Sequence, residues 1–235
     1  MHDIYRISLA ITFSIYTSCG PVAQNVNDTN SLVGENNLVN ANPELHPFIL
    51  GIGFIKSGCT ASHIGDGYVI TAGHCYSDYK HVKITDNLPC IDEPEKDIVW
   101  GYTSKTPKGY MTSKCKEIIN IVYNDDIDFA VTKYEPAPET ILKLDSDRYP
   151  TESQTISMFS HAEWGPLQWS GDCQVLGKNR KSASMFDYDC DTLFGSSGAP
   201  IFNSIFEVIG IHNRTNWWSS NAGSYLKDID LQEIL

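Results

Sequence analysis

The sequence of 235 residues lacks three features that would assign it to common protein classes. It has no C-x-x-C pair, so zinc-ribbon and thioredoxin-type sites have no support. No run of about 18 apolar residues occurs beyond the N-terminus, which excludes a membrane-spanning body. Basic residues are few, 17 Lys and Arg against 29 Asp and Glu. The resulting formal net charge of −12 excludes a nucleic-acid partner, because phosphate binding needs clustered cations.

What the chain does contain indicates a folded, exported protein. Its hydrophobic content of 41% and aromatic content of 11% suit one large domain or two small ones packed together. Its 7 cysteines are too many for an ordinary reduced enzyme of the cytosol. Disulfide bonds in an oxidising compartment account for them better than metal or redox chemistry does.

The N-terminus agrees with export. Residues 7–18 form a short apolar stretch after Arg6, with the length of a signal-peptide core rather than of a membrane span. Cys19 either leaves with the signal peptide or becomes the acylated residue of a lipoprotein. We therefore expect a signal peptide or lipoprotein signal over 1–19 and a linker or pro-segment over 20–46. The protein is then secreted, periplasmic or held at the cell surface by a lipid, and six cysteines remain for three bridges.

Strand-like segments dominate the chain after residue 47. Short apolar runs separated by turn residues have the length and composition of β-strands, namely FILGIGFI, GYVITAG, HVKIT, EIINIVY, DFAVTKY, TISMFS, CQVLG, PIFNS and EVIGIH. Such a series predicts an all-β sandwich or barrel, or two of them. The polar stretch 135–149 is the natural crossing between two domains, and the pattern of 225–235 suggests a final helix.

Three short motifs carry the chemistry. They are TAGHC at 71–75, DFAV at 128–131 and GSSGAP at 195–200. Each has an ordinary structural explanation when taken alone. A histidine at a strand end is usually structural, an aspartate that starts a strand is usually a turn residue, and glycines around a serine usually make a tight turn.

Together the motifs supply the parts of a nucleophilic hydrolase. A serine hydroxyl is a weak nucleophile that needs a base within hydrogen-bond reach and a buried acid to orient that base. His74, Asp128 and Ser197 supply this set in the order base, acid, nucleophile. The glycines around Ser197 let the backbone aim the N–H groups of Gly195 and Ser197 at one point, which predicts an oxyanion hole.

The TAGHC and GSSGAP segments resemble those of the chymotrypsin-like serine endopeptidases, whose usual forms are TAAHC and GDSGGP. They are more similar to the bacterial branch that includes the glutamyl endopeptidases, where GSSGSP-like and GIH segments occur. The resemblance covers residues 47–230. It implies an all-β fold of two six-stranded antiparallel β-barrels, with a short C-terminal helix and the triad in the cleft between them.

Under this resemblance the first barrel spans 47–140 and carries His74 and Asp128, and the second spans 141–235 and carries Ser197. Protein or peptide substrates are implied, and we expect a monomer without cofactor or metal. The family pattern places the acid just before an apolar-Ala-apolar strand, which selects Asp128. Its neighbours Asp125 and Asp126 are then solvated turn residues, and a calcium site there matches no known loop spacing.

The resemblance also pairs the cysteines. One bridge ties the histidine loop to the preceding strand, a second encloses the segment that leads to the nucleophile, and the third is left by elimination. The pairs are Cys59–Cys75, Cys173–Cys190 and Cys90–Cys115.

A metal site is the competing explanation for some of these residues. Its ligands would be Cys59, His63, His74 and Cys75. Adjacent side chains such as those of His74 and Cys75 cannot easily face one ion, so the disulfide is favoured.

Two positions depart from the family pattern. Ser196 stands where animal trypsins have the aspartate that pairs with a newly formed N-terminal amine, so activation by that switch is not expected. Any pro-segment must act in another way. Ala199 replaces a glycine, and the added methyl group is small enough to be tolerated.

The residues predicted to determine specificity disagree with one another. Asp191 lies six residues before Ser197, where an aspartate confers Arg/Lys preference in trypsins. His212 matches the histidine that contacts the substrate carboxylate in glutamyl endopeptidases, although a packed strand histidine is an equal explanation. Asn213 and Arg214 follow it, and the charge of Arg214 mildly favours an acidic substrate. We therefore predict cleavage after acidic residues, with Arg/Lys specificity as the alternative.

Two other classes of protein are alternatives to the serine endopeptidase. An α/β-hydrolase needs its acid and histidine after the serine, whereas only 38 residues follow Ser197 and no helices alternate with the strands. A blocked binding protein with the protease fold is the non-enzymatic alternative, in which Trp217 and Trp218 anchor a partner. A fluorophosphonate probe distinguishes the active enzyme from the blocked binding protein, since it labels only an activated serine.

Overall fold

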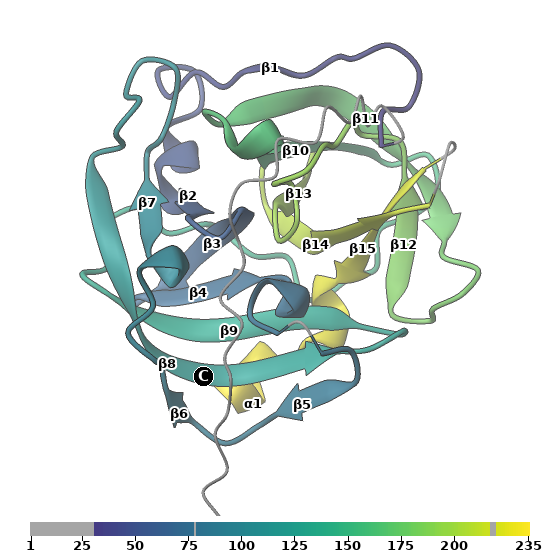
Figure 1. Cartoon of the computed structure of the whole chain (residues 1–235). Coiled ribbons are helices and arrows are strands. Elements are labelled where there is room, and N and C mark those ends of the chain that lie inside the picture. The colour runs from purple at the N-terminus through teal and green to yellow at the C-terminus, as the bar shows by residue number, and fades with distance from the viewer. Residues whose placement is uncertain (1–30, 78, 217–219) are drawn as a thin grey trace, which may run out of the picture.

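The computed structural model describes residues 31–77, 79–216 and 220–235. Figure 1 shows two β-barrels side by side, as the sequence predicts, with the C-terminus against the first of them. The predicted signal peptide, Cys19 and the Trp217–Trp218 pair lie outside the described residues. No helix in the described part of the chain is long and apolar enough to cross a membrane.

The first barrel is antiparallel and closed. Its order is β8-β7-β2-β3-β4-β9, and pairing of β8 with β9 completes the circle. Its strands are β2 (Ile52–Ile55), β3 (Cys59–Gly65), β4 (Tyr68–Thr71), β7 (Ile98–Trp100), β8 (Met111–Tyr123) and β9 (Asp128–Glu135). Two short strands, β5 (Val82–Ile84) and β6 (Leu88–Pro89), extend β8 on its outer side.

The second barrel repeats this plan. Its order is β11-β10-β13-β14-β15-β12, closed by pairing of β11 with β12. Its strands are β10 (Thr155–Ser160), β11 (Gln168–Lys178), β12 (Met185–Tyr188), β13 (Pro200–Asn203), β14 (Val208–Thr215) and β15 (Asn221–Tyr225). Together the barrels confirm the predicted fold of two six-stranded antiparallel β-barrels.

Short helices connect these strands. They are the 3₁₀ helices η1 (Pro47–Gly51), η2 (Gly73–Cys75), η3 (Pro94–Lys96), η4 (Ala162–Trp164) and η5 (Leu226–Asp228), and the α-helix α1 (Leu231–Ile234). The helix predicted over 225–235 is shorter than expected. Tyr225 still pairs as a strand with Gly210, and the Asp230 side chain caps α1 by accepting from the Glu233 N–H at 3.1 Å.

The two barrels are joined by a shared apolar core. Ile70 and Val131 of the first barrel belong to the same buried cluster as Phe159 and Phe202 of the second. Leu231 of α1 packs into this cluster, which fastens the C-terminus back to the first barrel. Burial of large aromatic and aliphatic side chains at this junction holds the barrels in one relative position, and the loops that meet along it can therefore form a site.

The N-terminal segment is a structural part of the second barrel. β1 (Val39–Asn40) pairs with Trp169 and Gln168 of β11, and the Ala41 N–H donates to the Leu167 carbonyl at 3.0 Å. The expectation of a linker without periodicity overlooked this pairing, because a two-residue strand at a sheet edge leaves no recognisable pattern.

Candidate active site

His74 and Asp128 are brought together by strand pairing. β4 leads into η2, which carries His74, and Asp128 begins β9. These two strands pair with Thr71 opposite Ala130. The Asp128 carboxylate accepts from the His74 backbone N–H at 3.0 Å through Oδ1, and Oδ2 lies 2.6 Å from Nδ1 of the imidazole. The Asp128 side chain is only 6% exposed and that of His74 is 27% exposed, so a buried acid orients a ring that solvent can still reach.

The second barrel supports the Asp128 backbone. Asn213 donates from Nδ2 to the Asp128 carbonyl at 2.7 Å, and the Asp128 N–H donates to Ser224 Oγ at 3.2 Å. Asn213 also accepts from the Ser224 N–H at 2.6 Å. Asn213 was predicted to line a specificity pocket, and the structure instead gives its amide a role in holding the acid across the two barrels.

Ser197 lies in a tight turn that contacts the first barrel. Its carbonyl accepts from the Thr60 N–H at 2.8 Å, and the next residue, Gly198, donates to the His212 carbonyl at 2.8 Å. A methyl group on Gly198 would lie 1.9 Å from Thr71 Oγ1 and 2.9 Å from the Ala72 nitrogen, two residues before His74. No hydrogen bond joins the Ser197 hydroxyl to the His74 ring, and catalytic contacts of this kind often tighten only when substrate binds.

We expect Gly198→Ala to destabilise the protein strongly. Gly198 has a φ of +81°, and besides the contacts above a Cβ would approach the Thr60 carbonyl oxygen to 2.3 Å. Gly171→Ala is the matched control, since Gly171 has a φ of +70° and nothing within 4 Å of its Cβ position. In thermal unfolding, the melting temperature should fall by roughly 10 °C for Gly198→Ala and by only a few degrees for Gly171→Ala. Equal falls in melting temperature would mean that backbone strain, and not the close approach of the two barrels, causes the destabilisation.

The N–H groups of Gly195 and Ser197 have no acceptor among the described residues. The peptide before Gly195 is held in a fixed orientation, because the Phe194 carbonyl accepts from the Glu163 N–H at 2.6 Å. In a trans peptide the C=O and N–H point in opposite directions, so the Gly195 N–H faces away from Glu163. The Gly195 carbonyl in turn accepts from Thr60 Oγ1 at 2.8 Å. Two unused donors in one turn, of which the Gly195 N–H is held in orientation, meet the requirement of an oxyanion hole.

His212 is a buried, neutral histidine. Its Nδ1 is hydrogen-bonded to the Tyr188 hydroxyl. Burial, reinforced by nearby His74, lowers the pKa of His212 to about 3. The ring proton of a neutral histidine sits on Nε2 when the hydroxyl donates to Nδ1, and on Nδ1 when the ring donates to the hydroxyl. Nε2 has no hydrogen bond among the described residues, yet it is not sealed from solvent as the Nε2 of His161 is. The Nε2 atom of His212 is therefore free to contact a ligand.

The carboxylate of Asp191 binds backbone groups of the N-terminal segment. Asp191 is 2% exposed, and its two oxygens accept from the Val33 N–H at 2.8 Å and from the Asn37 N–H at 2.7 Å. The sequence placed Asp191 at the base of a pocket for Arg or Lys. The structure uses both of its oxygens to fasten the N-terminal segment to the second barrel.

The two acids beside Asp128 differ from each other. Asp125 is an exposed turn residue paired with Lys80, which agrees with the expectation. Asp126 was also expected to be a solvated turn residue, but its carboxylate accepts from Ser182 Oγ at 3.0 Å and from the Ala183 N–H at 2.9 Å. It therefore ties the loop before β12 to the first barrel. The separation of 57 residues between Asp126 and Ala183 left no signal in the sequence.

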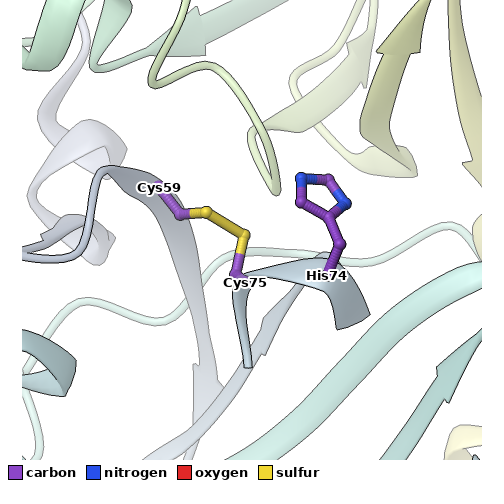
Figure 2. A group of neighbouring side chains, drawn as sticks. All are labelled: Cys59, His74 and Cys75. Carbon is purple, nitrogen blue, oxygen red and sulfur yellow. A yellow bond between two sulfur atoms is a disulfide. The ribbon is translucent and has the colours of Figure 1, made fainter. Parts of the chain in front are cut away.

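All three expected disulfides are present: Cys59–Cys75, Cys90–Cys115 and Cys173–Cys190. Figure 2 shows the first of them beside the His74 side chain, whose ring extends away from the sulfur atoms. The possible ligand atoms of these three residues lie within 4.8 Å of one another, but both sulfurs are bonded to each other.

His63, the fourth ligand of the competing metal site, is engaged elsewhere. Its Nδ1 lies 2.7 Å from the Thr140 carbonyl and its Nε2 accepts from the Gly67 N–H at 3.0 Å. Both ring nitrogens are used, so the structure supports the disulfide explanation of this group.

Several supporting residues escaped the sequence analysis. The Thr60 hydroxyl donates to the Gly195 carbonyl and accepts a hydrogen bond from the His161 N–H at 3.0 Å. Ser196, noted only as a departure from the trypsins, is fully buried and lies 2.9 Å from Ser160 between hydroxyl oxygens. These are common side chains in no recognisable motif, and only the folded chain reveals their partners.

Two antiparallel β-barrels with a His–Asp pair beside a glycine-flanked serine define the architecture of a serine protease. Residues 56–211 match the family model described as "Trypsin-like peptidase domain". The chain therefore belongs to the trypsin-like peptidase family, and it is a serine peptidase by that membership.

Solved structures agree with this fold. A Glu endopeptidase in complex with MPD is similar over 83% of this chain and 93% of its own, with a TM-score of 0.62 and 18% identity. The Rv3671c protease in an inactive form is similar over 82% and 93%, with a TM-score of 0.57 and 13% identity. A serine endoprotease from Yersinia pestis is similar over 71% and 53%, with a TM-score of 0.52 and 13% identity. No curated protein sequence matches the chain.

Proposed function

We propose that this protein is an exported serine endopeptidase that cleaves peptide bonds through Ser197, His74 and Asp128. The observation that carries the proposal is the 2.6 Å contact between His74 Nδ1 and Asp128 Oδ2, next to a serine turn with two unused N–H donors. The three disulfides support an oxidising compartment outside the cytosol.

In the proposed mechanism, His74 Nε2 takes the proton of the Ser197 hydroxyl as Oγ forms a bond to the substrate carbonyl carbon. The carbonyl oxygen becomes an oxyanion, which the N–H groups of Gly195 and Ser197 stabilise by about 3 kcal/mol each. The C–N bond then breaks, and the leaving amine receives the proton from His74. Water, deprotonated by the same imidazole, releases the acyl group and restores Ser197. Asp128 holds the ring in the required tautomer and stabilises its cation.

For specificity, we propose cleavage after acidic residues. We assign the ring proton of His212 to Nε2, with the Tyr188 hydroxyl donating to Nδ1. The Nε2–H is then a hydrogen-bond donor for a substrate carboxylate. The alternative preference for Arg or Lys relies on Asp191, whose oxygens already accept two backbone N–H groups. The acidic preference is therefore better supported.

We expect His212→Leu to lower kcat/KM for a peptide with Glu before the scissile bond by about 10- to 100-fold relative to the same peptide with Gln. A hydrogen bond to a charged group contributes about 1.5–3 kcal/mol, and leucine cannot donate one. Tyr188→Phe should lower the same ratio by a smaller factor, because the ring remains but its tautomer is no longer fixed. Fluorophosphonate labelling of each variant verifies that Ser197 is still folded and reactive. An unchanged Glu/Gln ratio in His212→Leu would exclude this residue as the specificity determinant.

The test of the proposed function itself is cleavage-site profiling. Purified protein that keeps the N-terminal segment paired with β11 is incubated with a diverse peptide mixture, with Ser197→Ala as the control, and the cut sites are identified by mass spectrometry. Cuts after Glu or Asp support the whole proposal, and cuts after Arg or Lys would keep the mechanism and transfer specificity to Asp191. Absence of both cleavage and fluorophosphonate labelling would favour the blocked binding protein.

A further inference from the structure

A positively charged cavity lies at the end of β14, the strand that carries His212. It has a volume of about 750 Å³ and is lined by residues of the β11–β12 hairpin and of the end of β14. Four cationic side chains and one carboxylate line it: Lys178, Arg180, Lys181, Arg214 and Asp187. In a chain of net charge −12, a local excess of cations is the opposite of the average surface.

The charges of this cavity are free to meet a ligand. None of its four cations forms an ion pair with a described carboxylate. Asp187 accepts from Asn179 at 2.6 Å and from Asn216 at 2.7 Å through Oδ1, and its single charge leaves the lining of four cations with a formal charge of 4 − 1 = +3. The cavity thus has the electrostatic character of a site for an anion.

The cavity is also held in shape by the first barrel. The loop that carries Lys181 continues into Ala183, whose N–H donates to Asp126 at 2.9 Å. On the opposite wall, Arg214 donates from Nη2 to the Asp125 carbonyl at 3.1 Å. Both walls are therefore fixed to the turn that precedes Asp128, and a ligand does not need to order them.

The position of the cavity along β14 relates it to Ser197. The pairing of β14 with β13 ends at Ile211 opposite Pro200. Beyond a register shift at Asn213, Arg214 and Thr215 pair only with β15. Their other edge has no strand partner among the described residues, and it lies shortly after His212, which contacts Gly198. An extended peptide can add to such an edge. All ladders in both barrels are antiparallel, and a peptide added in that sense would pass the cavity before it reaches Ser197.

We infer that this cavity is a subsite for an acidic side chain about two to four residues upstream of the scissile bond. This inference rests on the proposed peptidase function and extends it from the residue at the cut to the segment before it. A carboxylate there faces several unpaired cations at a partly screened surface. Such attraction strengthens binding and weakens as salt is added.

The direct test is peptide binding to the Ser197→Ala protein, which does not depend on turnover. Three fluorescein-labelled peptides share one sequence and differ only in carrying Glu, Gln or Lys three residues upstream of the cleavable bond. We expect the Glu peptide to bind about fivefold to tenfold more tightly than the Gln peptide at low salt, and the Lys peptide to bind more weakly. The difference should shrink at 0.3 M NaCl. Equal dissociation constants would overturn the inference.

Charge variants locate the effect. In the Ser197→Ala background, Lys178→Ala with Lys181→Ala should abolish the Glu advantage. The matched control is Lys108→Ala with Lys143→Ala, which removes the same charge from two exposed lysines that form no ion pair with a described residue. A loss in both double variants would assign the effect to net charge and overturn a defined subsite.

Kinetics on the active protein separate the two proposals. Cleavage of all three peptides at equal kcat/KM would retain the peptidase and reject the subsite. A Glu advantage in binding without cleavage by the wild-type protein would retain the subsite and reject the peptidase. Tighter binding of peptides that carry Glu only downstream of the bond would also reject the subsite. So would binding of a sulfated polysaccharide without any preference among the peptides.

Discussion

Replacing Ser197 by alanine is expected to lower peptide turnover by about 10⁶-fold. The hydroxyl is the only group of the proposed triad that forms a bond to the substrate, and alanine offers no nucleophile in its place. The backbone of the turn should persist, because Thr60 and His212 contact residues 197 and 198 only through main-chain atoms. The fold and the free N–H groups therefore remain, and only the chemistry is lost.

Steady-state kinetics on a peptide chosen from the cleavage profile measure this effect. Thermal unfolding of the same sample verifies that folding is unchanged. Ser204→Ala is the matched control, since Ser204 is an exposed serine of the same barrel and should leave kcat unaltered. Turnover by Ser197→Ala at the wild-type rate would reject Ser197 as the nucleophile, and with it the proposed mechanism.

Asp128→Asn is expected to lower kcat by about 10⁴-fold. Oδ1 of Asp128 accepts from the His74 backbone at 3.0 Å, so an asparagine would keep its carbonyl oxygen there. Its NH₂ group would then face Nδ1 of the imidazole, where Oδ2 now lies at 2.6 Å. A donor in that position places the ring proton on Nε2, the atom that must accept the proton from Ser197. The base would be present in the wrong tautomer.

The comparison that makes this result specific is Asp125→Asn. Asp125 is three residues away, exposed and paired with Lys80, and its loss should change kcat by less than twofold. Both variants remove one negative charge. An equal loss of kcat in the two would therefore come from the changed electrostatic field at the site and not from the tautomer of His74. Equal kcat values for Asp128→Asn and the wild type would reject Asp128 as the orienting acid.

The strands that the sequence predicted well are those whose apolar residues form continuous runs. DFAVTKY and TISMFS correspond to β9 and β10 almost residue for residue. β3 (CTASHIG) and β15 (NAGSY) escaped prediction although most or all of their residues are buried. Small and polar side chains fill these strands because the barrel interiors and the cleft leave little space there. In β15 a buried polar group is satisfied by Asn213, which accepts from the Ser224 N–H at 2.6 Å.

The sequence by itself determined the family of this protein and the outline of its fold, and it carries the proposed chemistry. Its three motifs, its cysteine pattern and its apolar runs are local features that survive in an unfolded chain. Only the tertiary structure decided how the remaining polar groups are used. Asp191 accepts from Val33 across 158 positions, and Asn213 donates to Asp128 across 85. Such pairs arise where two closed barrels and an N-terminal segment bring distant backbone together. The need to satisfy buried polar groups then selects partners that no spacing along the chain reveals.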